Sequence, residues 1–145
     1  MKATWSSTRE IKRGDAVDRY LRFRIPGLHH IPSEIRLHPA LEYWDAPLEP
    51  GGRPILVGKF PAMIVRGLDS AGNLVQIHKT YLTSDGAKAA VKHPKKTDIG
   101  VGSNSFALRL GEPTGGILGV SEGIETALAA TLLDGYVVWP CHSST

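Results

Sequence analysis

The sequence predicts an α/β (α+β) protein in which an antiparallel β-hairpin region packs with an incomplete strand–helix–strand unit. Three observations support this class. Two β-prone runs flank the turn-forming sequence DSAGN, which indicates a hairpin over residues 62–82. Further on, a strand-like run, a helix-like run and a second strand-like run follow one another over residues 117–139. At 145 residues, the chain has the length of one domain.

The first segment, residues 1–13, is a basic lead-in that we expect to be loose. The sequence GDAVDRYLRFR then predicts a short helix, because its apolar residues recur on one face. Asp15 is the expected N-cap of this helix. The spacing of Asp15 with Arg19, and of Asp18 with Arg22, predicts two ion pairs along it.

Residues 14–110 form the main region of the predicted fold. Prolines recur through residues 25–54 and exclude a long helix there, although the sequence EIRLH is compatible with a short strand before Pro39. After the hairpin, the polar, lysine-rich residues 83–104 predict a mobile loop. The sequence SFALRL, residues 105–110, predicts one more short strand.

Residues 111–145 carry the strand–helix–strand pattern. We expect strands at residues 117–120 and 136–139, joined by a helix over residues 125–134 that ends at Gly135. Such a short crossover predicts an adjacent parallel pair of strands. Because no later strand follows in this sequence, one parallel edge would stay open and would favour a homodimer or partner binding.

Charge is divided unevenly along the chain. All 17 Lys and Arg residues lie before residue 110, whereas four acids and no base follow. This asymmetry suits a protein that holds a polyanion with one part and a cation with the other, or it simply solvates the surface. No apolar run is as long as a membrane span and no apolar signal core is present, so we expect a cytoplasmic protein without membrane contact. The single cysteine, Cys141, excludes an internal disulfide and a Cys-rich zinc site.

Glu122 is the first candidate for chemistry. It lies where the first of the two parallel strands is expected to end, at the sheet edge where ligands bind in open α/β folds. A carboxylate there can act as a general acid/base or as a ligand for a hard cation. Alternatively, Glu122 and Glu125 only complement the positive end of the helix dipole.

Basic side chains are the second candidate, and they would bind phosphates in a salt-dependent and sequence-independent way. Four are expected in one loop and two on the hairpin: Lys88, Lys92, Lys95, Lys96, Arg66 and Lys79. The loop lysines are equally compatible with a solvated surface. The histidines show no spacing typical of metal ligands. The tryptophans are expected to pack in the core or at hinges.

The sequence GVSEGIETALAA resembles the first motif of Toprim domains, the nucleotidyl-transfer and strand-cleavage module of primases and topoisomerases. Together with residues 14–45 and 60–82, in the same order, it is similar to phage- and plasmid-type primases, in which this region links a zinc ribbon to the Toprim domain. The resemblance extends from about Gly14 to Trp139.

The resemblance implies that Glu122 corresponds to the Toprim glutamate, an acid/base in phosphoryl transfer. It also implies an Asp-x-Asp pair that binds Mg²⁺, but no Asp or Glu follows Asp134 here, and no cysteine precedes Cys141 to form a zinc ribbon. We therefore expect no cofactor beyond weak Mg²⁺ binding at Glu122, and no independent primer synthesis.

Two functional hypotheses follow. In the first, the chain is a primase-derived protein associated with nucleic acid, either DNA or RNA, and largely without catalytic activity of its own. In the second, it is a non-catalytic phage or mobile-element protein that binds and inhibits a partner from host nucleic-acid machinery, for example as an anti-CRISPR protein. The missing Asp-x-Asp pair favours binding over catalysis.

Overall fold

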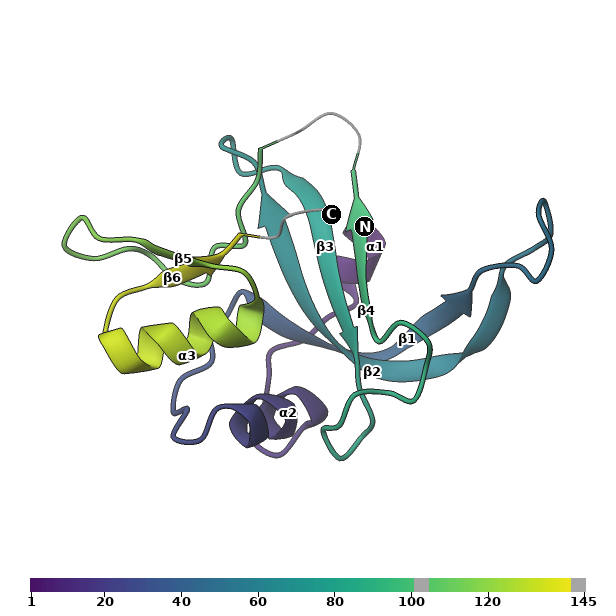
Figure 1. Ribbon diagram of the computed structural model, residues 1–145, viewed down its shortest axis with the longest axis horizontal. Helices are drawn as coiled ribbons and strands as arrows, with labels where there is room; N and C mark the ends of the chain where they lie inside the picture. The colour runs from purple at the N-terminus through teal and green to yellow at the C-terminus, as the bar shows by residue number, and fades with distance from the viewer. Residues whose placement is uncertain (101–104, 142–145) are drawn as a thin grey trace.

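The computed structural model describes residues 1–100 and 105–141 and has the predicted α+β fold (Figure 1). A four-stranded antiparallel sheet in the order β1-β2-β3-β4 lies beside a two-stranded parallel sheet formed by β5 and β6. The elements in chain order are α1 (Lys2–Ser6), α2 (Ala16–Arg24), β1 (Ile35–Asp45), β2 (Ile55–Leu68), β3 (Leu74–Tyr81), β4 (Lys95–Ile99), β5 (Gly119–Ser121), α3 (Ile124–Asp134) and β6 (Val138–Pro140).

The predicted hairpin is confirmed as β2 and β3, which pair antiparallel around the turn at residues 69–73. The preceding strand is much longer than predicted, because β1 continues past Pro39 to Asp45. Proline has no backbone N–H to donate, and the pairing of β1 with β2 shifts register between His38 and Leu41. This irregularity takes Pro39 out of the hydrogen-bonding ladder and lets the strand continue.

The prediction of a loop over residues 83–104 is wrong in part, since Lys95–Ile99 forms the edge strand β4 and pairs with β3. Residues 101–104 lie outside the described residues. The strand predicted for residues 105–110 is also wrong, because only Ala107 forms a β-bridge there, with Leu68. Up to Val65, the edge of β2 that faces away from β3 is already hydrogen-bonded to β1. Only the last residues of β2 can therefore pair with residues 105–110.

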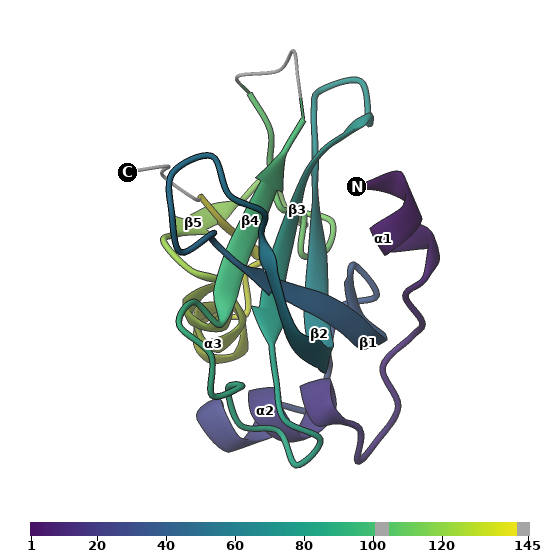
Figure 2. The same ribbon diagram turned by 90° about the vertical axis from the view of Figure 1, so that its right-hand side faces the viewer.

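The N-terminal lead-in is ordered, contrary to the expectation of a loose segment. α1 lies on one side of the four-stranded sheet and α3 on the other (Figure 2). The Trp5 ring holds α1 there: the guanidinium carbons of Arg36 and Arg66 lie 5.3 and 4.7 Å from its centroid. Arg9 then forms a β-bridge with Leu37. Aromatic and cation–π contacts therefore order the segment.

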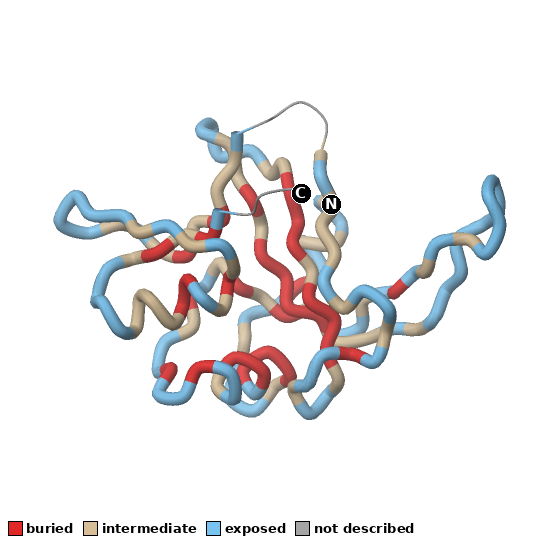
Figure 3. The backbone as a smooth tube through the Cα atoms, viewed as in Figure 1, coloured by how far each residue is buried: buried red, intermediate tan, exposed pale blue. Residues whose placement is uncertain are grey.

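The four-stranded sheet is covered on both faces, and the buried residues concentrate at its centre and on α2 (Figure 3). One face packs with α2 and α3 through an apolar cluster that includes Leu21, Met63 and Leu128. The other face packs around Tyr43 and Tyr81, whose rings meet edge to face with centroids 5.0 Å apart. Each face thus buries its own apolar cluster.

The distal halves of β1 and β2 extend as a two-stranded arm, residues 41–60, whose base packs in the core through Tyr43 and Phe60 and whose tip projects (Figure 1). Several of its apolar side chains are exposed, namely Trp44, Leu48, Ile55, Leu56 and Val57. The expectation that all three tryptophans pack in the core or at hinges is therefore wrong for Trp44.

The predicted parallel pair is confirmed, with boundaries shifted by one or two residues. β5 and β6 are adjacent and parallel, and α3 connects them. α3 ends at Gly135, whose φ of 73° is the left-handed conformation that glycine adopts without strain. Ile124, Leu128 and Val138 belong to the same apolar cluster as α2 and β1. The strand–helix–strand unit therefore shares a core with the main sheet.

Candidate functional site

Glu122 lies at the carboxyl end of the first parallel strand and is exposed, as predicted. β5 ends at Ser121, and Glu122 and Gly123 connect it directly to α3. Within residues 1–100 and 105–141, no group of three or more His, Cys, Asp or Glu side chains could hold a metal ion. Glu122 can offer a carboxylate to a proton or to a hydrated cation, but a bound Mg²⁺ would need further ligands from water or from a phosphate.

Glu125, in the first turn of α3, is the carboxylate that the fold encloses. It accepts a hydrogen bond of 2.5 Å from the Tyr20 hydroxyl of α2 and one of 3.0 Å from the Lys95 ammonium of β4. Burial disfavours its charge, but the bonds from Tyr20, the backbone and Lys95 outweigh burial and lower the pKa of Glu125 to about 2. Burial and the bond to Glu125 raise the pKa of Tyr20, so its hydroxyl stays protonated as the donor.

Three cations lie near the pair formed by Tyr20 and Glu125: Arg24, Lys88 and Lys95, here called the basic cluster. The Arg24 guanidinium carbon lies 4.8 Å from the centroid of the Tyr20 ring. Burial, and then the charges of Lys95 and Arg24, lower the pKa of Lys88, although Glu125 acts in the opposite direction. One carboxylate cannot neutralise three cations, so positive charge remains at the beginning of α3, a helix that starts two residues after Glu122.

Arg66 and Lys79 lie on the hairpin as predicted, whereas the four lysines expected in one loop are divided between the loop and the edge strand β4. Lys79 is paired with Asp98 at 2.7 Å, and Arg66 stacks on Trp5. The Lys96 ammonium lies 3.9 Å from the centre of the Tyr43 ring and donates to the Trp44 carbonyl. These three side chains form contacts within the fold.

Lys88 and Lys92 lie outside the named strands, and their predicted role in phosphate binding stays a prediction. Both are exposed, and neither forms an ion pair with any described residue. Lys95 contributes to the site from a strand and not from a loop. Sequence reasoning missed Arg24 and Tyr20, whose role arises from contacts between α2, β4 and α3 that no local pattern reveals.

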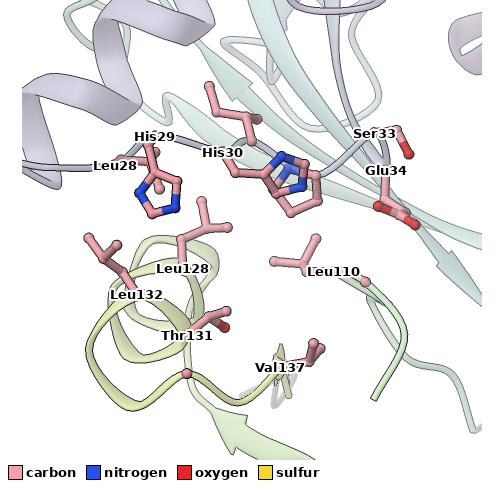
Figure 4. A pocket seen from close by; sticks show the side chains of 14 residues that line it. Leu28, His29, His30, Ser33, Glu34, Leu110, Leu128, Thr131, Leu132 and Val137 are labelled. Carbon is pink, nitrogen blue, oxygen red and sulfur yellow. The ribbon is translucent and has the colours of Figure 1, made fainter. Parts of the chain in front are cut away.

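A separate cavity of about 570 Å³ opens between α3 and residues 28–34 (Figure 4). Leu128 and Leu132 of α3 face His29 and His30 across it, and Leu110 and Val137 extend its apolar lining. Thr131 donates to the Ala127 carbonyl and accepts from the Val138 amide, so its hydroxyl is occupied within the fold. This cavity has the character of an apolar cleft with imidazoles at its border.

The fold and the basic cluster define a small α+β protein with a cationic surface. The chain belongs to the DUF7146 family, described as a domain of unknown function, whose family model matches residues 1–108. The matched part includes all three members of the basic cluster and stops before β5. No curated protein and no solved structure matches the chain. No helix in the described part of the chain has the length and apolar character needed to cross a membrane.

Proposed function

We propose that this chain is a nucleic-acid-associated protein of primase descent, which holds DNA or RNA and does not itself synthesise primers. The supporting observation is the position of the basic cluster. Segments far apart in the sequence bring Arg24, Lys88 and Lys95 close to Tyr20 and Glu125 at the beginning of α3, a helix that starts two residues after Glu122.

The chemistry of the site suits phosphate groups. Arg24 and Lys88 are exposed cations without an ion-pair partner among the described residues, so a phosphate can bind them without displacing an internal carboxylate. Lys95 is already paired with Glu125, so we expect it to contribute less to phosphate binding than Arg24 and Lys88. Binding to such a surface releases counterions and weakens steeply with added salt.

Glu122 is the residue that corresponds to the Toprim glutamate in the resemblance. An exposed carboxylate at a parallel strand end is where that family places its acid/base, and the basic cluster would bring a phosphate backbone near it. One carboxylate holds Mg²⁺ weakly, so binding is the activity that we expect from this chain. Template-dependent primer synthesis that Glu122→Gln abolishes would contradict the non-catalytic part of the proposal.

The test is a fluorescence-anisotropy titration of labelled single- and double-stranded oligonucleotides at several salt concentrations. The variant Arg24→Ala/Lys88→Ala/Lys92→Ala should weaken binding and flatten the log–log salt dependence by about 0.7 to 1 per lost phosphate contact. The matched control Lys2→Ala/Arg53→Ala/Lys59→Ala removes the same charge from α1 and the arm and should retain the wild-type affinity more closely. Equal losses in both variants, or no binding at low salt, would reject the proposal.

A second candidate function, binding to a protein partner such as a host defence or replication protein, is supported by the arm. Exposed apolar side chains on a projecting two-stranded ribbon are typical of protein contact surfaces. If the wild-type chain binds no oligonucleotide, protein binding becomes the favoured function.

A further inference from the structure

A groove of about 580 Å³ runs between α2 and the turn at residues 83–88, next to the basic cluster. Its lining includes Arg19, Phe23 and Arg24 from the helix and Gly86 and Lys88 from the turn. The two walls are held together closely. A Cβ atom on Gly86 would lie 2.5 Å from the Arg19 Cβ and 2.8 Å from the Tyr20 backbone nitrogen, and the Gly86 φ is +89°. Only glycine fits here, so the groove is part of the fold's packing.

Phe23 is the unusual member of this groove. Its side chain is 86% exposed, although α2 buries its other large apolar residues, Tyr20 and Leu21, almost completely. An exposed phenylalanine does not stabilise the fold by burial, and the face of its ring is accessible to a ligand. It offers a flat, apolar ring at the edge of a charged groove.

The charges in the groove are mainly positive and partly free. Asp18 is buried and pairs with Arg22 at 2.6 Å, and Asp85 accepts from the Thr83 hydroxyl and lies near Arg19. Arg24 and Lys88 have no ion-pair partner among the described residues. The groove therefore presents an aromatic ring beside an unpaired guanidinium and an unpaired ammonium.

We propose that this groove binds single-stranded nucleic acid, with a base stacked on Phe23 and the adjoining phosphates held by Arg24 and Lys88. An aromatic ring next to free cations is the combination that single-strand binders use. In a duplex the bases are stacked on one another, so a ring on a helix surface cannot reach their faces. A free phosphate or an acidic peptide would use the cations and leave Phe23 without a function.

This inference rests on the proposed function. It adds that the nucleic acid is single-stranded and that Phe23 recognises its bases. From the groove, the strand would pass Lys88 and Lys95 toward the beginning of α3, because Lys95 lies near Lys88 and pairs with Glu125 of α3 at 3.0 Å. Phe23 would thus hold the strand at one end of a path that leads toward Glu122.

The test compares three single-stranded probes of about 12 nucleotides: oligo-dT, oligo-rU, and an abasic strand with the same number of phosphates. The wild-type chain should bind oligo-dT and oligo-rU more tightly than the abasic strand. Phe23→Ala should weaken binding to both base-containing probes by about 5- to 100-fold and leave the salt dependence unchanged. It should also abolish the preference over the abasic strand. Comparing oligo-dT with oligo-rU separates DNA from RNA as the natural strand.

Three further variants keep the result interpretable. Phe23→Trp should retain the preference for bases, whereas Phe23→Leu, which keeps apolar surface without a ring, should behave like Phe23→Ala. Leu48→Ala removes an equally exposed apolar side chain from the arm and should bind like the wild type. A thermal melt of each variant checks that it is folded.

Two outcomes would overturn the inference, and they separate it from the proposed function. If Phe23→Ala binds oligo-dT like the wild type, with the usual salt dependence, nucleic-acid binding stands and the stacking role fails. If the wild-type chain binds no probe at low salt, the proposed function and this inference fail together.

Discussion

At the scale of single residues, Glu125 connects more of this molecule than Glu122 does. Its carboxylate accepts hydrogen bonds from α2 through Tyr20 and from β4 through Lys95, and it lies in the first turn of α3. Glu122, three residues earlier, is exposed. The two carboxylates therefore differ: Glu125 holds three elements together, whereas Glu122 is exposed to solvent.

The lowered pKa of Glu125 predicts a specific pH dependence of stability. Its pKa in the folded chain is about 2 against an ordinary value of 4.5, so its stabilisation is fully present above about pH 4.5. It is lost as the pH falls toward 2. At pH 7, Glu125→Gln should lower the free energy of unfolding by about 1.5 to 3 kcal/mol, because bonds to a charged acceptor are lost.

Urea denaturation of the wild type and Glu125→Gln at several pH values measures this effect. The difference between the two should shrink as the pH falls from about 5 to 2. Tyr20→Phe, which removes one of the donors, should also lose stability at pH 7 and converge with the wild type in acid. A difference that stays constant with pH would show that the carboxylate charge contributes nothing.

At the scale of elements, the sequence predicts those parts of the fold that local patterns determine. The hairpin of β2 and β3 follows from two β-prone runs and a turn, and the unit of β5, α3 and β6 follows from alternating strand-like and helix-like runs. The sequence did not predict β4, because KKTDI is polar and lacks the apolar alternation of a half-buried strand. Lysines are typical of edge strands, and this segment becomes a strand only by pairing with β3.

Part of the candidate site consists of residues that only the tertiary fold brings together, and local sequence does not predict these. Glu122 was placed correctly because strand ends can be read from local sequence. Tyr20 and Glu125 lie 105 positions apart, and nothing in either local sequence indicates that they meet. Arg24 joins them for the same reason, through the packing of α2 against the rest of the fold.

The position of β4 predicts that two nearby lysines differ in their effect on stability. Lys96 lies over the Tyr43 ring and donates to the Trp44 carbonyl, so Lys96→Ala should lower the free energy of unfolding by about 1 to 3 kcal/mol. Lys92 is exposed, and Lys92→Ala should change it by less than about 0.5 kcal/mol. Thermal or urea denaturation distinguishes the two, and equal effects would contradict the structural role of Lys96.

At the scale of the whole molecule, one apolar cluster joins both parts of the chain. Residues of α2, β1 and β2 pack together with Ile124, Leu128 and Val138 from the unit of β5, α3 and β6. The basic cluster lies at the same junction, because its three residues come from the main region and one of them, Lys95, pairs with Glu125 of α3. The candidate site therefore depends on the two parts remaining docked.

This shared core predicts that a charge in α3 unfolds the entire chain. Leu128 is 4% exposed and packs within that cluster, so Leu128→Asp places an unpaired carboxylate in it and should cost several kcal/mol. Leu133, on the same helix, is 83% exposed, so Leu133→Asp is the matched control and should leave stability nearly unchanged. Circular dichroism and tryptophan fluorescence should report one common transition in the wild type and a loss of folded signal in Leu128→Asp. A Leu128→Asp protein that keeps the sheet signals and loses only those of α3 would show that the main sheet folds independently, and that the basic cluster joins two separable units.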